Sequence, residues 1–204
     1  MFYFFHYDGI FSYFCTLIVK KRKQTEHQRP YDSNRMTTLY LVRHGETVDN
    51  AQQVMQGQTD GKLNEKGYQQ AGEVAQRMSQ VALDAVIASD LLRAVQTAQM
   101  IAAPHGLQVV TTPLLRERDW GDFTGRYIPS LQGEPWPDNI ETMEHLMERA
   151  ASFLMFVRNT YPGMTVLAVG HGIVNKVIQA VHYKKSTRDI ERMMNAEVRV
   201  LELE

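Results

Sequence analysis

The sequence contains a single cysteine, Cys15, among 204 residues, and it has no surplus of charge of either sign. One cysteine excludes an intrachain disulfide and a cysteine-rich metal site, and it is typical of a reducing compartment, so we expect a cytoplasmic protein. Lys and Arg number 22 against 23 Asp and Glu, which leaves a net charge of −1. Such a chain has no general attraction to nucleic acid or to an anionic membrane. Any affinity for anions must come from a few local cations.

Long apolar runs are also scarce, and the clearest one lies in an unusual N-terminal stretch. Ile10 to Val19 is too short to span a bilayer, and Asp8 interrupts the residues before it. A secretory signal would carry its positive charge before the apolar run, whereas Lys20 to Lys23 follow it. A membrane anchor and a signal peptide are therefore less favoured than an extension upstream of Met36. We expect residues 1–35 to lie outside the fold and residues 36–204 to form one domain, with no membrane partner for that domain.

Apolar runs and helix-like spacing alternate along residues 36–204. With 44% hydrophobic residues the chain is able to bury a sizeable core. Strands alternating with helices predict an α/β fold with a mostly parallel sheet and helices on both faces. The predicted strands cover residues 37–42, 84–89, 107–112, 164–169 and 197–203, and the predicted helices follow Asn64, Asp90, Thr142 and Gly172.

Two of the predicted strands end in a histidine beside a glycine. The first runs into Arg43-His44-Gly45, and the fourth runs into His171-Gly172. In parallel sheets ligands bind beyond the carboxyl ends of the strands, and Arg93 follows the end of another strand by only a few residues. The sequence therefore predicts one site that contains both histidines and two arginines.

The residue types of this site favour an anion. Each residue taken alone is as readily a surface charge or a packed histidine, but two guanidinium groups and two imidazoles together suit phosphate oxygens. A metal site made of His44, His171 and Glu117 has suitable ligand types, yet Arg43 would repel a divalent cation. We therefore predict no metal, and phosphate is the leading candidate ligand. Phosphoryl transfer without a metal needs cations for the equatorial oxygens, a nucleophile and an acid for the leaving oxygen.

The ordered motifs resemble those of the histidine phosphatase superfamily, also called the phosphoglycerate mutase-like family. The resemblance implies a three-layer α/β/α sandwich with a mostly parallel central sheet, and it implies neither metal nor cofactor. It also implies roles for individual residues: His44 as the phosphorylated nucleophile, Arg43, Arg93 and His171 as contacts of the phosphoryl group, Asn50 and the Gly172 amide as further contacts, and Glu117 as proton donor. The matching segments are LVRHGETVDN (41–50), GQTDGKLNEKGYQQA (57–71), SDLLRAVQTAQMIA (89–102), LLRERDWGDFTG (114–125) and AVGHGIV (168–174).

Three functions are consistent with this resemblance. The first is a metal-independent phosphatase that hydrolyses a small phosphorylated metabolite through a phosphohistidine. Only about forty residues separate Gly125 from the last motif strand, which is short for the substrate-enclosing insertion of a mutase and so favours the phosphatase. Arg118 directly after Glu117 keeps a phosphoglycerate mutase as the alternative, and a non-catalytic phosphate-binding regulatory module is the third. Trp136 is either a platform for a sugar or base or a packed loop aromatic.

Overall fold

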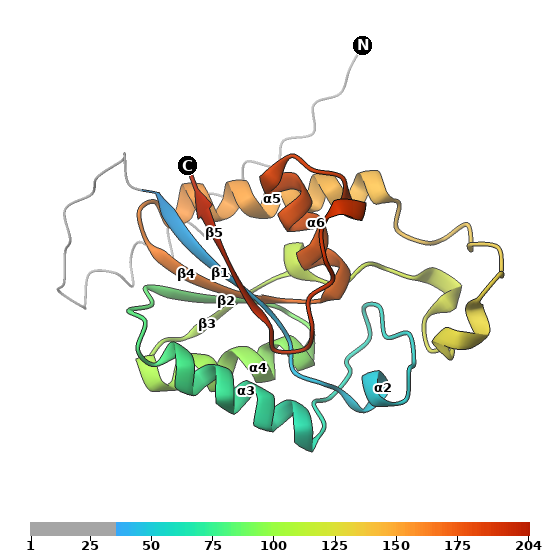
Figure 1. Cartoon of the computed structure of the whole chain (residues 1–204), viewed down its shortest axis with the longest axis horizontal. Helices are drawn as coiled ribbons and strands as arrows, with labels where there is room; N and C mark the ends of the chain where they lie inside the picture. The colour runs from blue at the N-terminus through green and yellow to red at the C-terminus, as the bar shows by residue number, and fades with distance from the viewer. Residues whose placement is uncertain (1–35) are drawn as a thin grey trace, which may run out of the picture. The chain divides into compact units, whose positions relative to one another are not determined.

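The structure is a computed structural model that describes residues 36–204. Its centre is a five-stranded sheet with the strand order β3-β2-β4-β1-β5 (Figure 1). The first four strands in this order run parallel, and β5 pairs antiparallel with β1 at the edge. The predicted mostly parallel sheet is therefore confirmed. The strands are β1 (Thr37–Arg43), β2 (Ala85–Ser89), β3 (Val109–Thr112), β4 (Thr165–Gly170) and β5 (Val198–Leu203).

Helices cover both faces of this sheet, which makes three layers (Figure 1). On one face α5 (Met143–Thr160) and α6 (Gly172–Tyr183) pack with a core that includes Phe153 and Leu41. On the other face α3 (Glu65–Met78) and α4 (Leu92–Ala102) pack with a second core that includes Val74 and Val42. Leu41 and Val42 are adjacent in β1, and neighbouring side chains in a strand point to opposite faces. One central strand thus contributes to both cores.

Local capping signals set most helix boundaries where the sequence predicts them. The Asn64 side chain accepts from the Gly67 amide at 2.8 Å, so α3 begins at the predicted cap. Thr142 caps α5 in the same way through the His145 amide. The apolar spacing of residues 68–78 predicts that Tyr68 faces the core, but Tyr68 is 42% exposed, and its hydroxyl accepts from Gln96 instead. Tyrosine has an apolar ring and a polar hydroxyl, so at the edge of the buried face it is able to contact both the core and solvent.

The long irregular segment between β3 and α5 lies at the same end of the domain as the loop after β1 (Figure 1). The sequence predicts a loop over residues 112–139, and the structure places three short 3₁₀ turns there: η3 (Pro113–Leu115), η4 (Gly121–Phe123) and η5 (Ile128–Leu131). Apart from these turns and α5, residues 113–164 form no further helix. The segment therefore adds a loop, not a helical cap, to the carboxyl edge of the sheet.

None of the helices within residues 36–204 is long and apolar enough to cross a membrane. The predictions made for residues 1–35 concern a part of the chain that lies outside the described residues.

Candidate active site

The two histidines meet because their strands are neighbours. Strands β1 and β4 pair in parallel with Arg43 opposite Gly170, so the residues that follow each strand end emerge side by side. The His44 amide then donates to the Gly170 carbonyl at 3.1 Å. The imidazole rings of His44 and His171 lie edge to face, with centroids 5.0 Å apart. Both side chains are buried, so the protein encloses this pair almost completely.

Hydrogen bonds determine which nitrogen of each imidazole carries the proton. Nδ1 of His44 lies 2.6 Å from the carbonyl oxygen of Gly45. Because a carbonyl only accepts, Nδ1 must be the donor, and Nε2 of neutral His44 keeps its lone pair. Nδ1 of His171 instead accepts from Nε of Arg93 at 3.1 Å, so its Nε2 carries the proton. The His171 Nε2 is buried and has no hydrogen-bond partner among the described residues.

Both imidazoles are held in their neutral form. Burial lowers the pKa of His44 well below its usual value, and the positive charges of Arg93 and Arg43 lower it further. Burial likewise lowers the pKa of His171, followed by the charges of Arg93 and of a protonated His44. A neutral imidazole is the form that acts as a nucleophile through nitrogen. The cations of the site therefore favour the nucleophilic state of His44 before any ligand arrives.

Arg93 is fixed from three sides. Besides its bond to His171, its NH1 donates to the Thr59 carbonyl at 2.6 Å and its NH2 donates to the Gly57 carbonyl at 2.8 Å. Arg93 is 1% exposed, and burial lowers its pKa to about 10. It keeps its charge at pH 7. The α4 helix thus presents a rigid guanidinium to the carboxyl edge of the sheet.

Arg43 is also buried and charged, but it has spare donors. Its NH1 donates to the Met193 carbonyl at 2.7 Å, while its Nε is buried without a partner among the described residues. Burial and the nearby positive charge of Arg192 lower the pKa of Arg43 to about 10. A buried guanidinium nitrogen without an acceptor costs free energy. An anion between the two arginines would satisfy it.

Glu117 reaches the same site from the segment after β3. Its carboxylate accepts from the backbone amides of Ile173 and Val174 at the start of α6, at 3.1–3.2 Å. A methyl group placed on Gly172 would lie 3.6 Å from the Arg43 guanidinium and 3.7 Å from Glu117 Oε2. Gly172 therefore lies between the Arg43 guanidinium and the Glu117 carboxylate. From the sequence alone, Glu117 could also pair with the neighbouring Arg116 or Arg118. In the structure Arg116 makes a bidentate ion pair with Asp90, and the Arg118 guanidinium donates to the Glu141 carbonyl.

Asn50 lies in the short helix α2 (Val48–Ala51), directly after the His44 loop. Its Oδ1 accepts from the Thr47 amide at 3.3 Å and from Asn195 Nδ2 at 3.3 Å. These bonds occupy the oxygen and leave the amide nitrogen as the donor that Asn50 is able to offer to an anion. All seven residues expected in the site from the sequence therefore gather at one edge of the sheet: Arg43, His44, Asn50, Arg93, Glu117, His171 and Gly172.

This arrangement matches a known family over almost the whole described chain. The family model of the histidine phosphatase superfamily (branch 1) matches residues 39–204. The chain belongs to the histidine phosphatase superfamily. It is thus related to enzymes, and the resemblance of its motifs to this family is confirmed.

Individual members of the superfamily that resemble this chain carry both phosphatase and mutase names. The "Uncharacterized phosphatase PhoE" of Bacillus subtilis is 40% identical over 141 residues, which cover 67% of this chain and 72% of that protein. The "Probable phosphoglycerate mutase GpmB" of Cronobacter sakazakii is 39% identical over 152 residues, covering 68% and 71%. A phosphoserine phosphatase from Entamoeba histolytica, solved with 3-phosphoglyceric acid, has a TM-score of 0.73 and 26% identity over 81% of this chain and 90% of that one.

One segment of this superfamily member contributes to the site without any signal in its sequence pattern. Residues 190–197 lie between α6 and β5, where Met193 offers its carbonyl to Arg43. Asn195 donates to the His44 carbonyl at 3.1 Å as well as to Asn50, so it connects the His44 loop with α2. These contacts join residues about 150 positions apart. Neither periodicity nor a local motif marks such long-range contacts, so these residues could not be predicted from the sequence.

A buried ion pair braces the segment that carries Glu117. Arg149 of α5 pairs with Glu141 at 2.9 Å, and its NH1 donates to the carbonyls of Leu114 and Arg116. Its NH2 lies 3.4 Å from the Glu117 carbonyl oxygen. The side chains of Arg149 and Glu141 are 11% and 6% exposed. Arg149, itself fixed by Glu141, therefore holds the Glu117 backbone in place.

No group of three or more His, Cys, Asp and Glu side chains within residues 36–204 is arranged to hold a metal ion. The three residues of the metal alternative lie in the site, but the Glu117 carboxylate accepts from the amides of α6.

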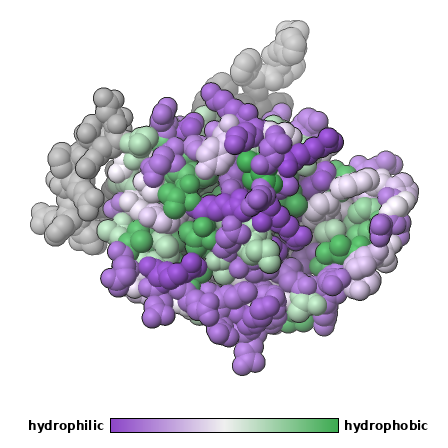
Figure 2. Space-filling view, viewed as in Figure 1, coloured by the Kyte–Doolittle hydropathy of each residue, from purple (hydrophilic) through white to green (hydrophobic). Residues whose placement is uncertain are grey.

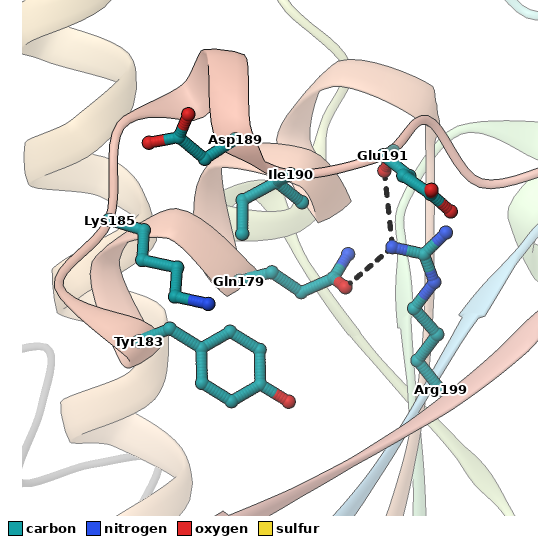
Figure 3. A pocket seen from close by; sticks show the side chains of 7 residues that line it. All are labelled: Gln179, Tyr183, Lys185, Asp189, Ile190, Glu191 and Arg199. Carbon is teal, nitrogen blue, oxygen red and sulfur yellow. Dashed lines mark hydrogen bonds between the residues drawn. The ribbon is translucent and has the colours of Figure 1, made fainter.

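A separate hollow of about 290 Å³ lies near the far end of α6 (Figure 3). Its Arg199 is already bonded to Gln179 at 2.9 Å and to the Glu191 carbonyl at 3.1 Å, and Lys185 lies beside Tyr183. Asp189 and Glu191 add negative charge to the same hollow. With both signs of charge and an engaged arginine, this hollow has no clear preference for an anion. The carboxyl edge of the sheet, with its two buried arginines, is therefore the better candidate for an anion site.

Proposed function

We propose that this protein is a metal-independent phosphatase that hydrolyses small phosphomonoesters through a phosphohistidine at His44. The observation that carries the proposal is the 2.6 Å contact between Nδ1 of His44 and the Gly45 carbonyl. It directs the lone pair of Nε2 into the cationic pocket and holds the ring at the same time. A nucleophile needs both a free lone pair and a fixed direction of attack.

The remaining residues fit the two halves of such a reaction. In the first half, Nε2 of His44 attacks phosphorus while Arg43, Arg93 and the protonated Nε2 of His171 neutralise the equatorial oxygens. Glu117 donates a proton to the leaving oxygen, and the alcohol departs. The Asn50 side chain and the Gly172 amide supply further donors to the phosphoryl group.

In the second half the same carboxylate works in reverse. Glu117 takes a proton from a water molecule, and the hydroxide oxygen forms a bond to phosphorus while the bond to His44 breaks. Inorganic phosphate leaves, and His44 returns to its neutral state. Glu117 is suited to both tasks because backbone amides of α6 and of Arg118 orient its carboxyl group without consuming its charge in an ion pair.

The shape of the segment 113–142 favours water over a sugar acid as the final acceptor. This segment is irregular apart from short 3₁₀ turns, and its Trp136 is 61% exposed. A mutase must return the phosphoryl group to a retained intermediate before water arrives, which calls for an enclosing cap. The mutase reaction is the alternative, supported by the mutase name of a 39% identical relative.

The first test is the hydrolysis of p-nitrophenyl phosphate in excess EDTA by the full chain and by a His44→Ala variant. We expect hydrolysis that persists with EDTA and disappears in the variant. Rapid quenching with ³²P-labelled substrate should trap an acid-labile, base-stable phosphoprotein in the wild type. Activity abolished by EDTA, or equal activity in His44→Ala, would contradict the proposal.

A second assay separates the phosphatase from the mutase. The enzyme is primed with 2,3-bisphosphoglycerate and mixed with 3-phosphoglycerate, and both products are measured. We expect inorganic phosphate to exceed 2-phosphoglycerate. A large excess of 2-phosphoglycerate would establish the mutase reaction, whereas binding without either product would favour the regulatory module.

A further inference from the structure

Beside the phosphate site lies an apolar hollow of about 580 Å³. We call it the aromatic hollow, and its walls include Met55, Trp120, Phe123, Ile128, Leu131 and Trp136. Figure 2 shows apolar side chains gathered on the right-hand side of the molecule, over the segment that contains η4 and η5. A contiguous patch of exposed apolar side chains often marks a site that binds a ligand or a partner.

The rings in the aromatic hollow are tilted against one another. Trp120 and Trp136 have ring centroids 6.0 Å apart at 37°, and Phe123 and Trp136 have centroids 6.3 Å apart at 50°. Trp136 is 61% exposed, so one face of a large indole remains in water. A flat apolar group inserted against this indole would remove that area from water.

The aromatic hollow shares one wall with the phosphate site. Met55 lines the hollow, and two residues later the Gly57 carbonyl accepts from Arg93 at 2.8 Å. Gly57 adopts a φ of +53°, and a side chain added there would meet the Trp120 ring at 3.3 Å. Trp120 therefore packs against the backbone that holds Arg93.

The same wall also leads to the residue proposed as the acid. Trp120 follows Glu117 by three positions, and Gln58 Nε2 donates to the Glu117 backbone carbonyl at 3.1 Å. The segment 55–58 thus connects the hollow with Arg93 and with the backbone of Glu117. Because Glu117 would protonate the leaving oxygen, a leaving alcohol would lie within reach of this hollow.

Arg118 holds the two tryptophans in this arrangement. Its guanidinium carbon lies 5.0 Å from the Trp120 ring centroid and 5.2 Å from that of Trp136. Its Nε donates to the Glu141 carbonyl at 2.8 Å, and the residue is 8% exposed. The position of Arg118 directly after Glu117 is a feature shared with mutases. In the structure its guanidinium instead makes cation–π contacts with the rings of Trp120 and Trp136.

The lining of the aromatic hollow offers no free charge to an acidic leaving group. Glu134 is the one ionisable residue among the described residues that line it, and it pairs with Arg126. The Arg118 guanidinium lies against the tryptophan rings and donates to the Glu141 carbonyl, so a carboxylate in the hollow would meet mainly apolar rings. An uncharged aromatic alcohol would meet only apolar rings and a thioether.

We propose that the aromatic hollow binds the leaving group and that the enzyme prefers phosphomonoesters of alcohols that carry an aromatic ring. This inference rests on the proposed phosphatase function. Preference for such substrates comes from burial against Trp136 and Trp120, while the phosphoryl group is held by the arginines and histidines. Small acidic phosphates would contact only the arginines and histidines that hold the phosphoryl group.

The test compares two substrates with leaving alcohols of similar acidity, 2-naphthylmethyl phosphate and n-propyl phosphate. Matched acidity makes the intrinsic reactivity alike, so the ratio of their kcat/KM values reports on the hollow. We expect the ratio to favour the naphthyl substrate and to fall about tenfold in a Trp136→Ala variant. Tyr183→Ala, which removes another exposed aromatic ring near the far end of α6, should leave both values unchanged.

A non-hydrolysable analogue keeps the two proposals separable. Binding of a 2-naphthylmethyl-bearing phosphonate to the full chain is measured by calorimetry for the wild type and for Trp136→Ala. Binding that weakens about tenfold in the variant supports the hollow even if no substrate turns over, in which case only the phosphatase proposal fails. Turnover with an unchanged ratio and unchanged binding in Trp136→Ala would overturn the role of the hollow and leave the phosphatase intact.

Discussion

Nε of Arg93 donates a hydrogen bond to Nδ1 of His171 at 3.1 Å. This contact joins a helix that follows β2 to the histidine that follows β4, and it makes a cation the orienting partner of an imidazole. An arginine cannot accept a proton, so it forces His171 to carry its own proton on Nε2. The buried Nε2 is then a neutral donor without an acceptor among residues 36–204, and it is able to donate to a bound anion.

Replacing Arg93 with lysine should reveal how much this orientation matters. Lysine keeps the charge but loses the planar set of donors that reaches His171, Gly57 and Thr59. We expect kcat/KM for an aryl phosphate to fall by roughly 100- to 1000-fold, as when one donor to a developing oxyanion is removed. Steady-state kinetics measures this, with Arg77→Lys on the exposed end of α3 as control. A loss shared equally by both variants would argue against a positioned guanidinium.

A Glu117→Gln variant should discriminate between leaving groups. A poor leaving group such as an alkyl alcohol needs a proton from Glu117, whereas p-nitrophenolate leaves without one. The first chemical step should therefore slow by about 100-fold or more for n-propyl phosphate and much less for p-nitrophenyl phosphate. Single-turnover measurements isolate that step from the later attack of water. Equal slowing of both substrates would assign Glu117 a purely structural role at the start of α6.

The stability of the protein should decrease in mild acid because of its buried histidines. Folding lowers the pKa of His44 and His171 below the ordinary value of 6.5. Below pH 6.5 the unfolded chain thus binds more protons than the folded one, and the free energy of unfolding falls as pH falls. Each imidazole contributes a slope of up to about 1.4 kcal/mol per pH unit in that range. Above pH 6.5 both are neutral in either state, and this contribution is constant.

Urea unfolding between pH 7.5 and 5 measures this slope for the wild type and for His44→Asn. The variant lacks one of the two imidazoles, so its stability should depend less steeply on pH below 6.5. Identical slopes would show that His44 does not resist protonation in the folded state.

Two glycines of α3 should respond in opposite directions to the same substitution. A methyl group on Gly67 would lie 2.0 Å from the Glu46 carbonyl oxygen, so the backbone that follows His44 would have to shift. A methyl group on Gly72 meets only the end of Met100 at 3.8 Å. We expect Gly72→Ala to raise the free energy of unfolding by about 0.5–1 kcal/mol through helix propensity. Gly67→Ala should lower it by about 1–3 kcal/mol and reduce activity.

Thermal unfolding and aryl phosphate hydrolysis measured on both variants check this pair. Because the substitution and the helix are the same, any difference reports the close approach of Gly67 to the nucleophile loop. A stabilising Gly67→Ala change with full activity would contradict that approach.

The sequence already contained the strands, most helix ends and the seven candidate residues. These features are local: an apolar run, a capping asparagine at 64 and short motifs around His44 and His171 are visible within a few positions. Parallel topology also follows from alternating strands and helices, and it predicts that strand ends share one edge. The sequence alone therefore predicts that these residues lie at one edge of the sheet.

The strand order, the contacts of residues 190–197 and the aromatic hollow emerged only in the folded molecule. Whether β1 neighbours β4, and so whether His44 meets His171 at 5.0 Å, depends on pairings between distant segments that no local pattern encodes. Asn195 and His44 are 151 positions apart, and Trp136 acquires its partners from other turns of an irregular loop. Local propensity acts over a few residues, whereas burial and complementarity select among long-range arrangements of the whole chain. The long-range arrangement of the chain determines the tautomers of His44 and His171 and lowers their pKa values. It also forms the aromatic hollow.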